Sequence, residues 1–147
     1  MPNPKRILVV TDFSACADAA LAYAVELAKA LGSKVMLLHT YELPVYDYPT
    51  AMVVATPQMV DAILSAADEA LAACCDAHAE SHVEITKVLR QGVAWDEINR
   101  VAQEVSADLI VVGTHGRQGI KRAVLGSVAE KVVRTSTKPV LTVHAAK

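Results

Sequence analysis

The most informative stretch for predicting the fold of this chain is Leu109-Ile-Val-Val-Gly-Thr-His-Gly-Arg-Gln-Gly-Ile-Lys-Arg-Ala-Val-Leu-Gly-Ser127. It opens with a short continuous apolar run, which is typical of a strand covered on both faces in a parallel sheet. A glycine-rich segment follows, and after it apolar residues return at helical spacing. The stretch therefore predicts a buried strand, a glycine-rich loop and a helix in series.

The same alternation extends outward over the rest of the chain. Apolar β-type runs occur at residues 7–11, 35–40, 83–89, 109–112 and 140–143. Helical periodicity separates them at residues 21–31, 59–74, 95–105 and 125–133. This order predicts an α/β fold, a single-domain (1–147) doubly wound five-stranded parallel sheet with four helices. The run at residues 83–89 alternates in polarity, so we expect it at an edge of the sheet.

One irregular stretch, residues 42–57, interrupts the alternation after the second strand. It holds three prolines and two of the four tyrosines. We expect a long loop there, and loops of this length are often functional or mobile. Whether it covers a ligand or contacts a partner stays open at this point.

Composition narrows the class of protein. Of 147 residues, 53% are apolar but only 4% are aromatic, and the net charge is −2. The sequence contains no basic stripe of the kind that would predict a nucleic-acid partner. It also contains no apolar segment close to the roughly 20 residues needed to span a bilayer. The three cysteines are a poor disulfide framework, because their number is odd and two are adjacent. We expect a cytoplasmic protein.

The glycine-rich stretch has the chemistry of an anion site. Glycines let the backbone approach a ligand closely, and Gly126-Ser127 opens a helix whose first N–H groups are unpaired. Three cations on the same loop, Arg117, Lys121 and Arg122, add positive charge. The spacing is neither that of a P-loop nor that of a dinucleotide-binding loop. The alternative is that the glycines only form turns and that Ser127 is a simple N-cap.

Polar residues at two other strand ends are expected to face this loop. Thr11-Asp12 follows the first strand and Thr40 ends the second. Ligands of open parallel sheets bind at the carboxyl ends of the strands, where the strand order changes direction. A carboxylate there can accept hydrogen bonds from ribose hydroxyls, and the backbone at Thr40 can meet the edge of an adenine.

The spacing Gly113-x2-Gly116-x9-Gly126-Ser127 resembles the signature of the ATP-binding branch of the universal stress protein family (UspA-like). The opening Ile7-Leu-Val-Val-Thr-Asp-Phe-Ser14 and the closing Lys138-Pro-Val-Leu-Thr-Val143 are also similar to that family. The resemblance covers essentially the whole chain. One departure is Gly92-Val93-Ala94, where the family often has Gly-x-Pro before a helix.

The resemblance implies an adenine nucleotide alpha hydrolase-like fold with strand order 3-2-1-4-5, and ATP, with or without Mg²⁺ or Mn²⁺, as the ligand. It also implies a homodimer paired through Val140–Val143. From composition and charge we expect no nucleic acid or membrane partner. The implied ligand-binding residues are Thr11, Asp12, Thr40, Gly113, Thr114, Gly116, Arg117, Gly126, Ser127 and Val128.

Several functions fit these residues. The leading hypothesis is an ATP-binding regulatory module of the stress response. Alternatives are a weak ATPase or autophosphorylating protein with Ser127 as acceptor, and a non-enzymatic interaction protein with a vestigial nucleotide loop. A flavin-binding relative is a more distant alternative.

Other reactive side chains have two interpretations each. Cys16 lies in the first turn of a helix, where a thiolate is favoured, but a buried filler is the simpler interpretation. Cys74, His78 and His82 recur every four residues and would share a helix face as metal ligands. His115 is expected as a solvated loop residue or a lid over the nucleotide, and His39 as a core histidine with its hydrogen bonds satisfied.

Overall fold

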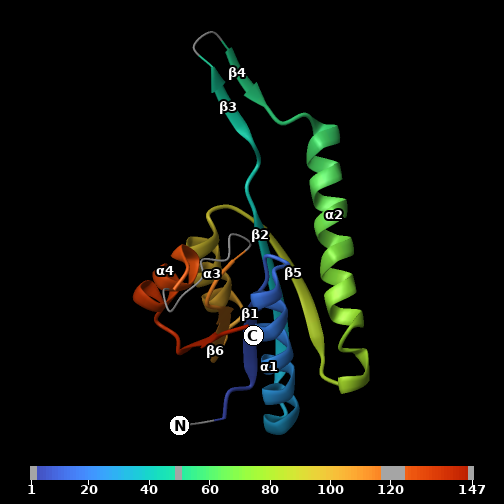
Figure 1. Cartoon of the computed structure of the whole chain (residues 1–147), viewed down its shortest axis with the longest axis vertical. Helices are drawn as coiled ribbons and strands as arrows, with labels where there is room; N and C mark the ends of the chain where they lie inside the picture. The colour runs from blue at the N-terminus through green and yellow to red at the C-terminus, as the bar shows by residue number, and fades with distance from the viewer. Residues whose placement is uncertain (1–2, 49–50, 117–124, 146–147) are drawn as a thin grey trace.

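The computed structural model describes residues 3–48, 51–116 and 125–145. Its main sheet has five strands, all parallel, in the order β5-β2-β1-β6-β7 (Figure 1). The strands are β1 (Arg6–Val10), β2 (Lys34–Tyr41), β5 (Ile85–Gln91), β6 (Leu109–Gly113) and β7 (Val140–Val143). Counted along the chain, these strands have the predicted order 3-2-1-4-5, with the third of them at an edge.

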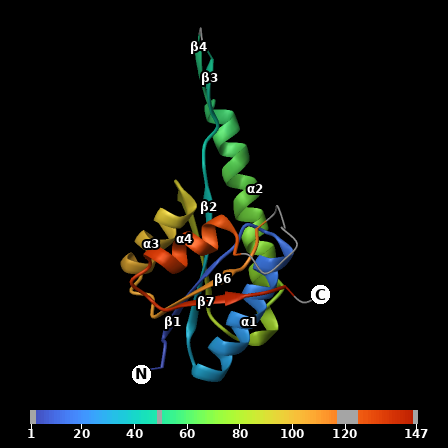
Figure 2. The same ribbon diagram turned by 60° about the vertical axis from the view of Figure 1, so that its left-hand side comes forward.

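Two helices cover each face of the sheet. One face carries α1 (Ala15–Leu31) and α2 (Pro57–Asp76), and the other carries α3 (Ala94–Glu104) and α4 (Ser127–Thr135). Figures 1 and 2 show the two layers on either side of the strands. The doubly wound architecture predicted from the sequence is therefore confirmed.

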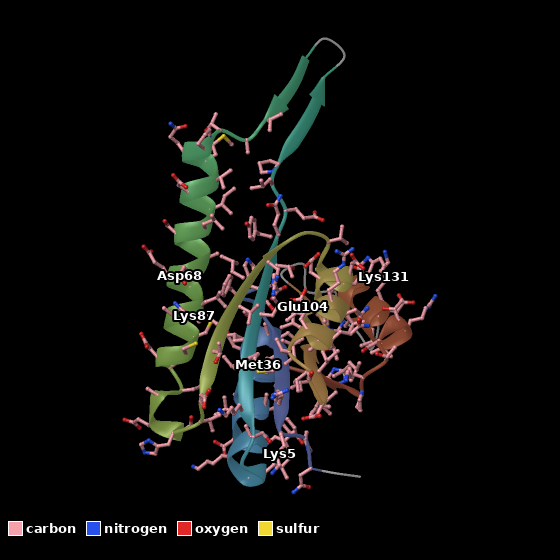
Figure 3. All side chains as sticks on the ribbon, turned by 180° about the vertical axis from the view of Figure 1, so that it is seen from behind. Lys5, Met36, Asp68, Lys87, Glu104 and Lys131 are labelled. Carbon is pink, nitrogen blue, oxygen red and sulfur yellow. The ribbon has the colours of Figure 1, made fainter. Side chains whose placement is uncertain are left out.

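Alternation along β1 explains why its apolar run is continuous. Ile7 and Val9 pack against α1 and α2, whereas Leu8 packs against α3 and α4. All three side chains are fully buried. The residues of the edge strand β5 are half-buried or exposed, in contrast to those of β1. Lys87 of β5 forms an ion pair with Asp68 of α2 at 2.8 Å (Figure 3).

The start of α1 is fixed by a side-chain cap. Ser14 Oγ accepts a hydrogen bond from the backbone N–H of Ala17 (3.2 Å), and Gly32 ends the helix in the left-handed conformation. We expect Ser14→Ala to lower the free energy of unfolding by about 1 kcal/mol, because this N–H loses its partner. Urea denaturation measures the change. Ser65→Ala, on the exposed face of α2, is the control and should leave stability within about 0.5 kcal/mol.

The stretch at residues 42–57 is not the irregular loop that the sequence predicts. It contains an antiparallel hairpin of β3 (Val45–Tyr48) and β4 (Ala51–Val54), which projects beyond the main sheet (Figures 1 and 2). Aromatic and β-branched residues favour strands, and here they outweigh the neighbouring prolines.

The backbone conformation does not allow Cys74, His78 and His82 to act as metal ligands from one helix face. Helix α2 ends at Asp76, a short 3-10 helix follows at Ala79–Ser81, and His82 has a φ of 58°. The three side chains therefore do not share one helix face. Within residues 3–48, 51–116 and 125–145, no group of three or more metal-ligating side chains comes together.

In the described part of the chain, no helix combines the length and the apolar composition needed to cross a bilayer.

Candidate functional site

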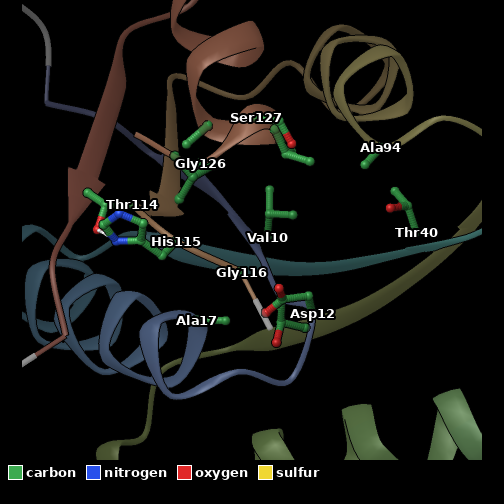
Figure 4. A pocket seen from close by; sticks show the side chains of 15 residues that line it. Val10, Asp12, Ala17, Thr40, Ala94, Thr114, His115, Gly116, Gly126 and Ser127 are labelled. Carbon is green, nitrogen blue, oxygen red and sulfur yellow. Dashed lines mark hydrogen bonds between the residues drawn. The ribbon is translucent and has the colours of Figure 1, made fainter. Parts of the chain in front are cut away.

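A pocket lies at the carboxyl ends of β1, β2 and β6 (Figure 4). Strand β1 stands between β2 and β6, so the chain order changes direction here, where open α/β sheets bind their ligands. The cavity measures about 340 Å³. It is lined by Val10, Thr11, Asp12, Ala17, Thr40, Ala94, Val112, Gly113, Thr114, His115, Gly116, Gly126, Ser127, Val128 and Ala129. Every predicted site residue lines it except Arg117, which lies outside the described residues.

The turn after β1 holds Asp12 in a fixed position. Thr11 Oγ1 accepts a hydrogen bond from the N–H of Phe13 (3.0 Å), and Phe13 adopts a left-handed φ of 64°. Asp12 Oδ1 accepts a hydrogen bond from the N–H of Ser14 (3.0 Å). The first bond forms an ST turn and the second an Asx turn, and together they present the carboxylate to the pocket.

Gly116 lets the glycine loop pass close to this carboxylate. A Cβ added at Gly116 would lie 2.6 Å from Asp12 Oδ2, which is below any normal contact distance. The absence of a side chain therefore brings backbone and carboxylate together on one side of the pocket. Sequence alone could place both residues at the site, but not this contact between them.

On the other side of the pocket is the N-terminus of α4. Gly126 is the N-cap of α4 and makes no side-chain capping bond. Ser127 is the first residue of the helix and therefore not its N-cap, as the alternative interpretation of the sequence had it. The first backbone bond of the helix runs from the N–H of Glu130 to the carbonyl of Gly126 (2.9 Å). The N–H groups before it carry the positive end of the helix dipole. In Figure 4, Ser127 and Asp12 lie on opposite sides of Val10.

The remaining wall comes from small and apolar residues that sequence reasoning missed. Ala94 opens α3 at the position where the related family often has proline, and Ala17 comes from the first turn of α1. The N-cap of α3 is Val93, whose apolar side chain makes no capping hydrogen bond. Alanine carries no chemical signature, so only the fold reveals these contacts. A second hollow of about 410 Å³ adjoins this wall beside Trp95.

The two histidines near the pocket differ in role. His39 is half-buried rather than in the core. Its Nδ1 makes a 2.8 Å hydrogen bond with the carbonyl oxygen of Thr11, and its ring lies 4.5 Å from that of Phe13. His115 is not a solvated loop residue. Its ring is half-buried, with Nδ1 at 3.2 Å from Thr114 Oγ1 and a buried Nε2 that has no partner in the described part of the chain.

The geometry suits an anionic ligand with hydroxyl groups. The first N–H groups of α4 have no partner within the helix, and together with the helix dipole they favour negative charge at one end of the pocket. The carboxylate of Asp12 can accept hydroxyl hydrogens at the other end. Between them the walls are apolar, at Val10, Val112 and Val128. A phosphate, a sugar and a flat apolar base would each find a matching surface.

The comparisons with known proteins point to one family. The model of the universal stress protein family matches residues 3–144. A universal stress protein of Methanocaldococcus jannaschii is 32% identical over 145 residues, which is 97% of this chain and 84% of that protein.

Solved structures agree with this match. A universal stress protein in complex with cAMP has a TM-score of 0.71 and 26% identity, covering 99% of this chain and 100% of that one. One from Archaeoglobus fulgidus in complex with dAMP has a TM-score of 0.69 and 25% identity, covering 97% and 99%. Because the family model spans nearly the whole chain and the sheet order agrees, this chain belongs to the universal stress protein family.

Proposed function

We propose that the pocket binds ATP and that the chain is a nucleotide-dependent regulatory module of the stress response. The observation that carries the proposal is the placement of Asp12 opposite the uncapped N-terminus of α4, on the two sides of one pocket. Relatives of the same fold are described in complex with cAMP and with dAMP, both adenine nucleotides.

Each side of the pocket would hold one part of the nucleotide. Asp12 would accept hydrogen bonds from the ribose, and the backbone at Thr40 would meet the adenine edge. The phosphates would lie against Gly116, Gly126 and the first N–H groups of α4, with the Ser127 hydroxyl as a further donor. Thr11, Gly113, Thr114 and Val128 would complete the enclosure. Asp12 is the one carboxylate among the described lining residues, so a Mg²⁺ or Mn²⁺ ion would depend mainly on phosphate oxygens and water.

Isothermal titration with ATP, ADP, AMP and adenosine tests the proposal. We expect ATP to bind at least about tenfold more tightly than adenosine, because the helix N-terminus adds charge-assisted hydrogen bonds to phosphate. Titration with GTP is the control for the base. No heat with any of these ligands, together with no nucleotide released from freshly purified and denatured protein, would overturn the proposal.

We further propose that the chain forms a homodimer through β7. This strand is an edge of the sheet, and its residues Val140–Val143 are only partly buried in the single chain. An apolar edge strand is a template for pairing with a second copy. Light scattering on Thr142→Pro, which removes a backbone donor from this strand, should give a monomer, whereas an unchanged mass would contradict pairing through β7.

We also propose that the protein is cytoplasmic, because its three free thiols fit a reducing compartment.

A further inference from the structure

The side chains of Cys16, His115 and His144 meet around the hydroxyl of Thr114, which lies in the wall of the pocket. Cys16 of α1 places its Sγ 3.6 Å from Thr114 Oγ1. The Nδ1 atoms of His115 and of His144, which follows β7, each lie 3.2 Å from the same oxygen. Thr114 is 1% and Cys16 7% exposed, whereas His115 is half-buried and His144 is exposed, so the cluster reaches from the interior to the surface.

The hydroxyl at the centre can pass a proton between its neighbours. It carries one hydrogen and two lone pairs, so it donates to only one of the three groups at a time. As a thiol, Cys16 can donate to the carbonyl oxygen of Val143, at 3.6 Å. When the thiol ionises, the Thr114 hydroxyl can turn to the sulfur while an imidazole N–H donates to the Thr114 oxygen. A nucleophile is thereby linked to two bases through one hydroxyl.

The surroundings of the sulfur favour the ionised form. Cys16 is the second residue of α1, at the positive end of that helix. Burial acts to raise the pKa of its thiol, but hydrogen bonds from the Thr114 hydroxyl and from the backbone at His115, Ala145 and Thr114 outweigh it and lower the pKa.

The other two thiols of the chain have the opposite environment. Burial raises the pKa of Cys74, and the charge of Asp18 and the neighbouring Cys75 raise it further. Burial also raises the pKa of Cys75, against a smaller lowering effect of Lys87. Both are half-buried and more accessible than Cys16, which is 7% exposed. The chain therefore contains its own reference thiols.

We propose that Cys16 is a modification site for small peroxides, with Thr114 as the positioning residue that activates it. The thiolate sulfur attacks one oxygen of hydrogen peroxide, an S–O bond forms and the O–O bond breaks. Sulfur loses two electrons and becomes a sulfenic acid. The second oxygen leaves as hydroxide and becomes water with the proton that the thiol released. Because Cys16 is only 7% exposed, only a small reagent is expected to reach its sulfur.

The modification would act on the nucleotide loop. The N–H of Thr114 donates to the carbonyl oxygen of Val143 (3.0 Å), and the carbonyl oxygen of Thr114 accepts a hydrogen bond from the N–H of Gly126 (2.6 Å). An oxygen added to Cys16 Sγ occupies the space beside Thr114 and displaces this connection between β6, β7 and α4. This consequence for nucleotide affinity rests on the proposed function, whereas the reactivity of Cys16 does not.

The reactivity is tested on reduced full-length protein without nucleotide. Hydrogen peroxide is added at pH 7, samples are quenched and denatured with a cyclic 1,3-diketone that traps sulfenic acid, and the peptides are quantified by mass spectrometry. We expect Cys16 to be oxidised at least about tenfold faster than Cys74 or Cys75, because thiolate character governs the rate. Equal rates, or faster oxidation of either reference thiol, would overturn the proposal.

Variants of Thr114 separate activation from structure. Thr114→Val should slow oxidation of Cys16 by about tenfold, and Thr114→Ser, which keeps the hydroxyl, should restore it. Thr86→Val, on the exposed side of β5, is the matched control and should react as wild type. Wild-type rates after Thr114→Val would contradict the role of the hydroxyl. Should Thr114→Val not fold, the pH profile decides, because Cys16 must reach its maximal rate at lower pH than Cys74 and Cys75.

The link to nucleotide binding has its own measurement. Peroxide-treated wild type should bind ATP at least about fivefold more weakly than reduced protein, and peroxide-treated Cys16→Ser should be unaffected. Unchanged affinity of a protein oxidised at Cys16 would refute the link. Because the oxidation rates need no ligand, a failed ATP titration of untreated protein would count against the proposed function alone.

Discussion

Gly116→Ala is expected to weaken ATP binding by about 10- to 100-fold while lowering the free energy of unfolding by no more than about 1 kcal/mol. The new Cβ would lie 2.6 Å from Asp12 Oδ2. That atom is the end of a side chain, so the carboxylate can turn away where a backbone atom could not. The turn costs about 1 kcal/mol, because the hydrogen bond from the N–H of Ser14 to Asp12 Oδ1 is weakened. Once rotated, the carboxylate no longer faces the pocket, and the hydrogen bonds proposed for the ribose are lost. Titration calorimetry and urea denaturation together measure the two effects.

Gly32→Ala is a control with the opposite signature. Gly32 has a φ of +67°, and nothing lies within 4 Å of the Cβ that alanine would add. Its substitution should cost about 1 kcal/mol of stability through backbone strain alone and leave ATP affinity unchanged. If Gly116→Ala and Gly32→Ala showed the same pattern, the effect at Gly116 would be general destabilisation rather than loss of the carboxylate contact.

A double-mutant cycle shows whether Asp12 carries the effect. Asp12→Ala alone should also weaken binding by about 10- to 100-fold, because it removes the same carboxylate. In the double variant the second change should add little, since both substitutions act through one interaction. Additive losses would mean that Gly116 contributes through direct backbone contact with the nucleotide instead.

The sheet could be predicted from the sequence because its physical cause is local. A strand buried on both faces must be apolar at every position, and the run Ile7 to Val10 shows this directly. The glycine spacing also predicted the loop after β6 as one side of the pocket. The polar residues at the ends of the first two strands predicted the opposite side. Periodicity and spacing are properties of single segments, so they survive in the sequence.

Three other features could not be predicted in the same way. The hairpin of β3 and β4 was hidden by prolines that are typical of loops. The spacing of Cys74, His78 and His82 suggested one helix face, although the helix ends at Asp76. The contact of Cys16 with Thr114 joins residues 98 positions apart, and no local pattern encodes it.

Gly113→Ala is expected to reduce both stability and ATP affinity, in contrast to Gly116→Ala. A Cβ at Gly113 would lie 3.0 Å from the backbone carbon and oxygen of Cys16 and 3.3 Å from the backbone nitrogen of Ala17. These are main-chain atoms of the first turn of α1, and they cannot rotate away as a carboxylate can. The end of β6 and the start of α1 must therefore separate, at a cost of about 1–3 kcal/mol.

The backbone origin of this clash makes a sharper test possible. Removing the side chain beside it, in the double variant Gly113→Ala with Cys16→Ala, should not restore stability, because the obstructing atoms are still present. Thermal and urea denaturation of the single and double variants measure this directly. Recovery to within about 0.5 kcal/mol of Cys16→Ala would show that the Cys16 side chain, and not the main chain, requires glycine at the end of β6. Since both Gly113 and Ala17 line the pocket, the same separation moves two of its walls apart, and affinity must fall together with stability.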